Sequence, residues 1–229
     1  MIRRPPRSTQ SRSSAASDVY KRQFVDGSKT MIEMTALSNG INLPLDKVGM
    51  NGPISEVKDL HKTLIPEKDG GVLSDTGRVD FAFGPAPGVF SIVKSDSPTV
   101  IEEMEYLSMG EGPYYTLYRP YHLASVEAPR SVGMAIINNE PGLQPKTWIS
   151  EVVGHAKKDL EPGETIDGIG GFSSYGVAYP VSDSKGLAPL GLLEGGTVTK
   201  LIKAGDPISL ESVELPENLI NELRKKQKN

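Results

Sequence analysis

The sequence predicts an α+β fold, in which a mixed helix-and-sheet region is followed by a smaller all-β region. Residues 24–147 alternate helical patterns with short apolar strands, which is typical of an α+β domain. From Trp148 onward, short β segments alternate with Gly- and Pro-rich turns. We therefore place a leader at 1–23, a first domain at 24–147, a β domain at 148–219 and a C-terminal tail at 220–229.

The composition is that of a soluble globular chain that lacks cysteine. Of its 229 residues, 37% are hydrophobic, which is enough for a buried core. The absence of cysteine excludes disulfides, thiolate metal sites and a cysteine nucleophile, and it suits a reducing cytoplasm. No apolar run approaches the roughly 18 residues that a membrane span needs, so we expect a cytoplasmic protein with no membrane partner.

Charge is distributed unevenly along the chain. Residues 1–23 carry a net charge of +5, whereas the whole chain carries −4, which leaves −9 on residues 24–229. A nucleic-acid surface needs clustered Lys and Arg to neutralise phosphates. The acidic body therefore argues against a nucleic-acid partner.

The first 23 residues, MIRRPPRSTQSRSSAASDVYKRQ, stand apart from the rest of the sequence. They are basic, Ser-rich and without apolar periodicity, so a disordered or targeting segment is one interpretation, including a transit peptide. The interpretation that we favour is that the string resembles translated sequencing-adapter DNA. We then expect an N-terminal truncation, with the true protein continuing upstream of Phe24.

Several helices are expected in the first domain. The longest begins at Asp26–Ser28, where either end residue can cap it, and ends at Gly40 in the left-handed conformation. Helical spacing also predicts helices over 55–64 and 99–107, and one over 122–137 that is interrupted near Pro129.

The strands of the first domain are predicted from the alternation of apolar with small or polar residues. Residues 79–83 and 88–94 show this alternation on either side of a Pro/Gly turn, and they predict a hairpin-like pair. Residues 114–119 predict a further strand, and residues 151–156 predict the strand that opens the β domain.

The β domain contains an internal repeat. Residues 158–166, KDLEPGETI, match residues 200–208, KLIKAGDPI, as apolar-x-x-Gly-acid-x-Ile. The glycine permits the positive φ of a tight turn, and the isoleucine returns to the core. Two copies about 42 residues apart predict a small β domain with pseudo-twofold symmetry.

A first group of candidate site residues lies where the first helix begins. Lys29 is expected to act as a general acid, because an enclosed ammonium shifts its pKa readily and can neutralise a developing alkoxide. Glu33 lies four residues later and would hold Lys29 charged. Asp26 and Ser28 are expected to bind substrate. The alternative is an exposed Lys–Glu pair of small structural value.

The second group is the polar-aromatic stretch 114–122, YYTLYRPYH. Arg119 offers a planar fork suited to phosphate or carboxylate, and His122 can exchange protons near neutral pH. Tyr115, Tyr118 and Tyr121 are expected to contact substrate. The alternative is a strand buried by aromatic packing, with Arg119 in an internal ion pair.

The remaining polar residues give weaker evidence of a functional role. Asn51, in the loop over 48–53, is expected to hydrogen-bond a substrate hydroxyl, although a simple turn is an equal alternative. His61 and His155 are interpreted as structural, and their spacing forms no metal pair. The glycine-rich stretch 168–176 lacks the third glycine of a dinucleotide fingerprint and precedes no helix.

The doubled K-x-L-x-x-G-E-x-I motif resembles the SAF domain, a β-clip fold. The segments FVDGSKTMIEM, GMNGP, GGVLSDTGRVDFAFGPAPGVF, MGEGPYYTLYRPYHL and DLEPGETIDGIGGFSSYG, in that order, resemble homoserine-dehydrogenase-like oxidoreductases with a C-terminal SAF domain. That family includes the DXR-like (DRL) reductoisomerases, which convert 1-deoxy-D-xylulose 5-phosphate to 2-C-methyl-D-erythritol 4-phosphate with NADPH. The resemblance covers residues 24–219.

The resemblance implies a Rossmann domain, then a catalytic domain, then a SAF domain, and no Rossmann fingerprint stands in this sequence. We therefore expect the NADP or NAD cofactor to be bound mainly by a missing N-terminal domain and this fragment to be inactive alone. The expected substrate is a small phosphorylated or polyol-type carbonyl compound, and a homo-oligomer is expected at full length. The alternatives are a sugar- or partner-binding SAF module without catalysis and an oligomerisation role for that domain.

Overall fold

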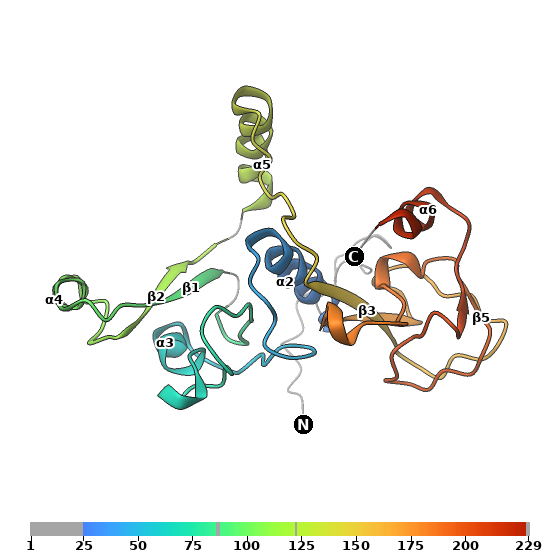
Figure 1. Ribbon diagram of the computed structural model, residues 1–229, viewed down its shortest axis with the longest axis horizontal. Helices are drawn as coiled ribbons and strands as arrows, with labels where there is room; N and C mark the ends of the chain where they lie inside the picture. The colour runs from blue at the N-terminus through green and yellow to red at the C-terminus, as the bar shows by residue number, and fades with distance from the viewer. Residues whose placement is uncertain (1–24, 86–87, 122, 228–229) are drawn as a thin grey trace, which may run out of the picture. The chain divides into compact units, whose positions relative to one another are not determined.

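The computed structural model describes residues 25–85, 88–121 and 123–227 (Figure 1). The chain divides into two compact units. The C-terminal unit contains the described residues up to Met31, together with Val152–Val177 and the described residues from Gly186 onward. The central unit contains Ile32–Glu151 and Ala178–Lys185.

The helical elements are α2 (Ser28–Ile41), η1 (Val57–Asp59), α3 (Leu60–Thr63), η2 (Glu67–Asp69), α4 (Pro98–Tyr106), α5 (Ala124–Gly133), the π-helical η3 (Met134–Asn138), η4 (Val181–Asp183), η5 (Leu190–Leu192) and α6 (Leu219–Lys226). The strands are β1 (Val89–Lys94), β2 (Tyr114–Arg119), β3 (Ser150–Ala156), β4 (Ser174–Pro180), β5 (Thr197–Val198) and β6 (Val213–Glu214). They form three two-stranded sheets, β1–β2, β3–β4 and β5–β6. This combination of helices and small antiparallel sheets confirms the mixed helix-and-sheet class.

The first predicted helix is α2, and its expected end is wrong. Gly40 lies inside the helix, and the left-handed residue is Asn42, with φ 58°. Gly40 is buried against Leu143, whose side chain occupies the space that a Cβ would need. Close packing, and not a helix stop, therefore explains this glycine.

The shorter helices follow the predictions to different degrees. The helix expected over 55–64 is reduced to one turn each of η1 and α3. The helix expected over 99–107 is α4, which begins at Pro98. Pro98 is the first residue after the N-cap, a position that suits the fixed φ of proline. Pro129 lies inside α5 without ending it, and η3 continues the helix.

The predicted hairpin of residues 79–83 with 88–94 is wrong. Strand β1 pairs instead with β2, antiparallel, with Val89 opposite Arg119 and Lys94 opposite Tyr114. Residues 79–83 run alongside earlier loops and form only single parallel bridges, from Val79 to Leu45 and from Phe83 to Ile54. The pairing was missed because β1 and β2 are separated along the chain by α4.

The core of the central unit includes a cluster of three buried leucines, Leu60, Leu64 and Leu73, and partly buried side chains from β1 pack against them. Other apolar side chains of the unit are buried as well, among them Leu45, Met50, Ile65, Val79 and Tyr115. Hydrogen bonds supplement this packing, because Asn39 on α2 donates to the carbonyl of Ser150 and accepts from its amide. Apolar packing and polar contacts therefore both hold this unit together.

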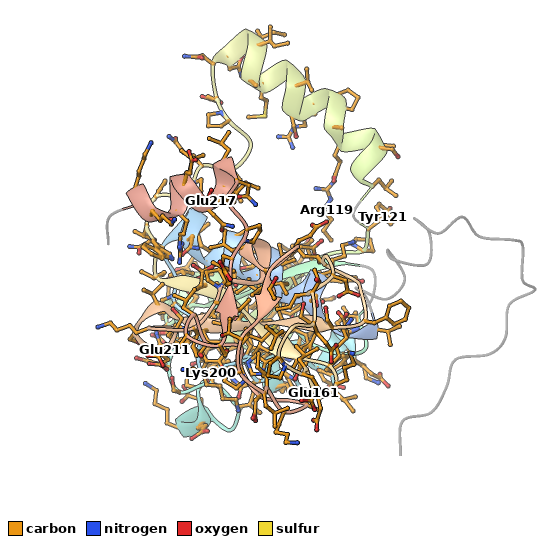
Figure 2. The ribbon with its side chains drawn as sticks, turned by 90° about the vertical axis from the view of Figure 1, so that its right-hand side faces the viewer. Arg119, Tyr121, Glu161, Lys200, Glu211 and Glu217 are labelled. Carbon is orange, nitrogen blue, oxygen red and sulfur yellow. The ribbon has the colours of Figure 1, made fainter. Side chains whose placement is uncertain are left out.

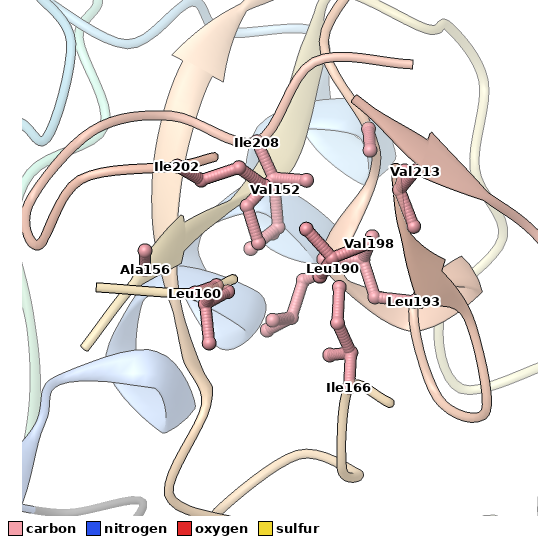
Figure 3. Close-up of a cluster of buried hydrophobic side chains, with 11 residues drawn as sticks. Val152, Ala156, Leu160, Ile166, Leu190, Leu193, Val198, Ile202, Ile208 and Val213 are labelled. Atoms are coloured by element: carbon pink, nitrogen blue, oxygen red, sulfur yellow. The ribbon is translucent and has the colours of Figure 1, made fainter. Parts of the chain in front are cut away.

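The C-terminal unit is built around a larger apolar cluster (Figure 3). Its eleven buried members come from β3, β5, β6, η5 and the turns between them: Val152, Ala156, Leu160, Ile166, Ala188, Leu190, Leu193, Val198, Ile202, Ile208 and Val213. Each fully buried aliphatic side chain contributes about 1.5–3 kcal/mol relative to an exposed one.

The repeat predicted from the sequence has matching geometry in its two copies. Gly163 and Gly205 have φ values of 90° and 89°, which only glycine adopts readily. Ile166 is 1% exposed and Ile208 is fully buried. The turn and core roles assigned to these residues are confirmed.

The two copies also exchange hydrogen bonds. The amide of Gly163 donates to Val198 O at 2.8 Å, and the amide of Gly205 donates to Ala156 O at 2.8 Å. Ala156 and Val198 are themselves 42 positions apart, so one bond becomes the other when the copies are interchanged. Three further pairs of bonds are interchanged in the same way when 42 is added to or subtracted from each residue number. They are Ile166 N–Gly196 O with Ile208 N–Gly154 O, Val198 N–Glu164 O with Ala156 N–Asp206 O, and Leu160 N–Ile202 O with Ile202 N–Leu160 O.

The chain ends in the short helix α6. Asn218 caps it by accepting a hydrogen bond from the amide of Asn221, and Arg224 to Lys226 complement the negative end of the helix. None of the helices in the described parts of the chain is long and apolar enough to cross a membrane.

Candidate functional site

The β1–β2 sheet places three of the predicted substrate residues around one hollow. Its volume is about 370 Å³, and Tyr118, Arg119 and Tyr121 line it together with Leu117 and three residues of β1, Val89 to Ser91. The register explains this, because Arg119 lies opposite Val89 and Tyr118 opposite Phe90. A hollow of this size suits a small ligand.

Arg119 is the charged group of this hollow. Its guanidinium pairs through Nη2 with Glu127 Oε1 on α5, and its side chain remains 61% exposed. Tyr121 is 58% exposed, and Figure 2 shows both residues near the first turn of α5. The ring of Tyr118 packs against Gly88, where a Cβ would overlap it. An anion can therefore reach Arg119 from solvent, although Arg119 already has a carboxylate partner.

The other tyrosines of the stretch are buried. Tyr115 is fully buried, and its hydroxyl has no hydrogen-bond partner among the described residues. Tyr114 donates to Asp69 Oδ2 at 2.6 Å. Burial, together with this bond and the charge of Asp69, raises the pKa of Tyr114 to about 12. The substrate contact expected of Tyr115 stays a prediction, and in this conformation its hydroxyl does not face solvent.

A second polar cluster surrounds Asn51. Its Nδ2 donates to Asp46 Oδ2 at 2.8 Å and to Asp80 Oδ2 at 2.9 Å. The amides of Asn51 and Gly52 also donate to Asp80, at 3.0 Å each. Both hydrogens of the Asn51 amide are therefore committed, and only its carbonyl oxygen is left for a substrate hydroxyl.

Asp46 is the buried carboxylate of this cluster. Its side chain is 6% exposed, and Arg78 Nε lies 3.3 Å from Oδ1. Burial acts to raise the pKa of Asp46, but hydrogen bonds from Ser74 and Asn51 outweigh it, so the pKa lies below its usual value. The carboxylate is therefore held ionised, as a structural anchor for the loop over 48–53.

A third polar cluster lies in the C-terminal unit, at the start of α2. Lys157 Nζ lies 2.6 Å from Asp26 Oδ2 and donates to Gly171 O at 2.6 Å. Burial acts to raise the pKa of Asp26, but the hydrogen bond from Lys157 and those from Ser28 outweigh it, and the pKa is lowered. Asp26 and Lys157 are thus an ion pair, with side chains 14% and 20% exposed.

Ser28 is an internal contact of the same region. It is fully buried, and its Oγ accepts a hydrogen bond from the amide of Gly176 at 2.8 Å. Its predicted role in substrate binding stays a prediction, which has to compete with this internal bond. Lys29 and Glu33 lie one turn apart on α2, as expected from their spacing. Nothing in the geometry assigns them a role, so their catalytic functions stay predictions.

The glycine-rich loop over 168–171 does not fit a dinucleotide. A phosphate cradle needs free amides at the start of a helix. Here the amide of Ser173 donates to Asp167 Oδ1 at 2.9 Å, and the carboxylate of Asp167 fills the space beside Gly171. The loop leads into β4 and not into a helix. An internal carboxylate therefore takes the place that a phosphate would need.

The predicted residues are divided between the two units, and each group is described within its own unit. Tyr118, Arg119 and Tyr121 share a hollow, whereas Asp26 and Ser28 belong to the ion-paired start of α2. His122, the predicted proton-exchange residue, lies outside the described residues. In the described parts of the chain, no three His, Asp or Glu side chains gather as metal ligands.

Three charged residues were missed by the sequence analysis: Lys157, Asp46 and Asp80. Most of their contacts join positions far apart in sequence, and no local motif marks them. The Asp26–Lys157 pair spans 131 positions, and the Asn51–Asp80 bond spans 29. The detectable signal was weak, namely a lysine directly after the apolar strand at 151–156.

Comparison with known families gives one match over a large part of the chain. Residues 7–128 match the family described as "Oxidoreductase DRL, catalytic domain". No curated protein matches the chain. The matched range begins inside the segment set aside as a leader and contains every predicted site residue. It covers more than half of the 229 residues, and the family indicates an enzyme of the oxidoreductase class. The chain therefore belongs to the oxidoreductase DRL catalytic-domain family.

Proposed function

We propose that the chain is the substrate-binding part of an NAD(P)H-dependent oxidoreductase, either DXR-like or homoserine-dehydrogenase-like. The proposed substrate is a small phosphorylated or polyol-type carbonyl compound, bound in the β1–β2 hollow. The observation that carries this proposal is the position of Arg119, an exposed guanidinium between two tyrosines at the rim of that hollow.

Arg119 favours an anionic group on the substrate. A guanidinium presents several N–H donors in one plane and can bind two oxygens of a phosphate at once. In its ion pair with Glu127, Arg119 is 61% exposed and Glu127 is 26% exposed, and pairs that are open to solvent contribute little, typically ~0–1 kcal/mol. A phosphate can therefore displace or share this partner at small cost, while Tyr118 and Tyr121 offer hydroxyl groups for sugar oxygens.

Lys29 is the proposed proton donor. Reduction of a carbonyl places negative charge on its oxygen, and an ammonium group nearby can neutralise that charge or donate a proton. A bound nicotinamide would supply the hydride for such a reduction. Because the loop over 168–171 does not fit a dinucleotide, we assign none of the described residues to the cofactor, and we expect NADPH affinity weaker than ~1 μM for this chain.

For the C-terminal unit, we propose a SAF-like β-clip domain. The exchange of hydrogen bonds between segments 42 residues apart supports this proposal, because the doubled motif is what the resemblance rests on. It also keeps open a second function, a sugar- or partner-binding module without catalysis. Binding of a neutral sugar that survives every change at Arg119 would favour this second function.

The test is ligand binding by the 229-residue chain, measured by calorimetry with 1-deoxy-D-xylulose 5-phosphate and with the same sugar lacking phosphate. We expect the phosphorylated sugar to bind more tightly, and Arg119→Gln to weaken its binding at least tenfold. Arg130→Gln is the matched control, because Arg130 is also an exposed arginine but lies on α5 and not in the hollow. This variant should bind like the wild type. Equal affinity for the two sugars, or unchanged binding by Arg119→Gln, would contradict the assignment.

A further inference from the structure

We propose that a cavity in the central unit binds a small aliphatic monocarboxylate, with the carboxylate at Lys94 and Arg78 and the tail among apolar side chains. The cavity, here called the Lys94 cavity, has a volume of about 270 Å³. It is separate from the substrate hollow proposed above, because neither Lys94 nor Arg78 lines that hollow. All of its lining residues belong to the central unit, so one compact unit sets its shape.

Apolar side chains from several parts of the chain line the Lys94 cavity. Leu37 and Ile41 lie one turn apart on α2, and Phe90 and Ile92 lie on one face of β1. Three buried residues add to this lining: Leu64, Leu73 and Val79. An aliphatic chain is stabilised on such a surface because it leaves water there. The lining therefore favours a ligand with a hydrocarbon tail.

Lys94 brings a positive charge to this apolar lining. It lies on the same face of β1 as Phe90 and Ile92, and its Nζ is 5.6 Å from the centre of the Tyr114 ring. Its ion-pair partner is Asp96, whose Oδ1 is 3.6 Å from Nζ and whose side chain is 81% exposed. Such a solvated pair contributes little. A carboxylate in the cavity therefore competes for Lys94 with a weak partner.

Arg78 is the second basic residue of the lining. Its side chain is 26% exposed, and its contacts with Asp46 and Ser74 are both made through Nε, at 3.3 and 3.4 Å. Its two terminal NH₂ groups make no hydrogen bond or ion pair with the described residues. A guanidinium has five N–H donors, so the terminal groups can donate to a carboxylate while Nε keeps its contacts.

The acidic residue of the lining, Asp80, is already supplied with donors. Its carboxylate accepts hydrogen bonds from the amides of Asn51, Gly52 and Phe81 and from Asn51 Nδ2. Asp46 balances the charge of Arg78, so Lys94 is the charge that decides which ligands the cavity prefers. A positive group favours an anionic head group over a neutral one.

The volume of the Lys94 cavity sets the length of the tail. Protein interiors are close-packed, and voids larger than a water molecule are few. At roughly 30 Å³ per non-hydrogen atom, the share of liquid volume that one water takes, 270 Å³ holds about nine such atoms. Hexanoate is close to this size, whereas a long-chain fatty acid or a nucleotide exceeds it. We therefore take hexanoate as the probe.

The first test is calorimetric titration of the 229-residue chain with hexanoate, with 1-hexanol, which lacks the carboxylate, and with acetate, which lacks the tail. We expect hexanoate to bind with a Kd below about 1 mM and the other two at least tenfold more weakly. Lys94→Gln should weaken hexanoate binding at least fivefold and leave 1-hexanol binding unchanged. Lys58→Gln, 74% exposed on η1, is the matched control and should bind hexanoate like the wild type.

The second test fills the cavity. Ile92→Phe places a larger side chain in it, so hexanoate binding should be lost while the unfolding temperature stays the same or rises. Arg119→Gln, in the substrate hollow, should leave hexanoate binding unchanged, which separates this site from the proposed function.

Three results would overturn the proposal. The first is no hexanoate binding at high millimolar concentration. The second is equal binding of hexanoate and 1-hexanol, or hexanoate binding that Lys94→Gln leaves intact. The third is hexanoate binding that persists in a folded Ile92→Phe chain or is lost in Arg119→Gln, because the ligand would then bind elsewhere. If Ile92→Phe does not fold, the Lys94→Gln titration decides.

Discussion

The C-terminal and central units hold themselves together in different ways. The C-terminal unit closes around one cluster of eleven buried hydrophobic residues, and its two repeat copies exchange backbone hydrogen bonds. The central unit combines several smaller groups of buried apolar residues with polar networks such as Asp46–Asn51–Asp80. It also contains the β1–β2 hollow.

The difference shows which unit has the larger buried core and which one keeps reactive side chains exposed to solvent. Exposed guanidinium, tyrosine and apolar groups are available for binding only where the unit has not used them for its own packing. Most of the range that matches the oxidoreductase family falls in the central unit. The contrast predicts that substitutions of buried apolar residues should lower the stability of the C-terminal unit most. Substitutions in polar networks should lower the stability of the central unit more.

The largest expected effect is on the repeat core. Ile166→Ala and Ile208→Ala should each lower the free energy of unfolding by about 2–5 kcal/mol, because both remove a fully buried side chain and leave a cavity. Their equal roles in the two copies predict similar losses. Leu210→Ala, 45% exposed, is the control and should change little in urea unfolding. Losses that differ severalfold between the two isoleucines would break the symmetry argument.

In the central unit, Asn51→Ala should destabilise by about 1–3 kcal/mol, because Asp46 and Asp80 each lose a donor. Thermal unfolding of this variant and of Gln144→Ala, an exposed amide in the same unit, measures the difference. An Asn51→Ala protein as stable as the control would mean that the network does not anchor the loop over 48–53.

A third prediction concerns pH and the Asp26–Lys157 pair. The pKa of Asp26 is lower in the folded chain than its ordinary value of 3.8. The stabilisation is therefore fully present well above pH 3.8, and it is lost as pH falls from there through the folded pKa. Asp26→Asn should be less stable than the wild type at pH 7, and the gap should narrow toward pH 3. Asp206→Asn, an exposed carboxyl of the same unit, should show a smaller gap, measured by urea unfolding at each pH.

The smallest expected effect is at Tyr115. Its buried hydroxyl has no partner among the described residues, so Tyr115→Phe should leave stability unchanged or raise it by up to ~1 kcal/mol. Tyr114→Phe loses the bond to Asp69 and should lower stability by about 1 kcal/mol. A marked loss in Tyr115→Phe would reveal a partner for that hydroxyl and support a binding role for it.

Local signals in the sequence were sufficient for some elements and not for others. The strand at 114–119, the helix α4 and the turns at Gly163 and Gly205 were predicted because each depends on residues close together in the chain. Gly40 was misassigned because its reason is Leu143, which lies 103 positions later.

The candidate site divides in the same way. The clustering of Tyr118, Arg119 and Tyr121 follows from one strand and its end, so the sequence was enough. Lys157 was missed because the contact that gives it meaning, with Asp26, forms only when distant segments meet. The pairing of β1 with β2 was missed for the same reason.

The exchanged hydrogen bonds of the C-terminal unit have a consequence for substitutions. The backbone bonds come in four pairs whose members are interchanged when the two copies are exchanged, which is the relation between two identical chains about a symmetry axis. Because each copy accepts bonds that the other donates, a change that displaces one copy removes backbone hydrogen bonds from both.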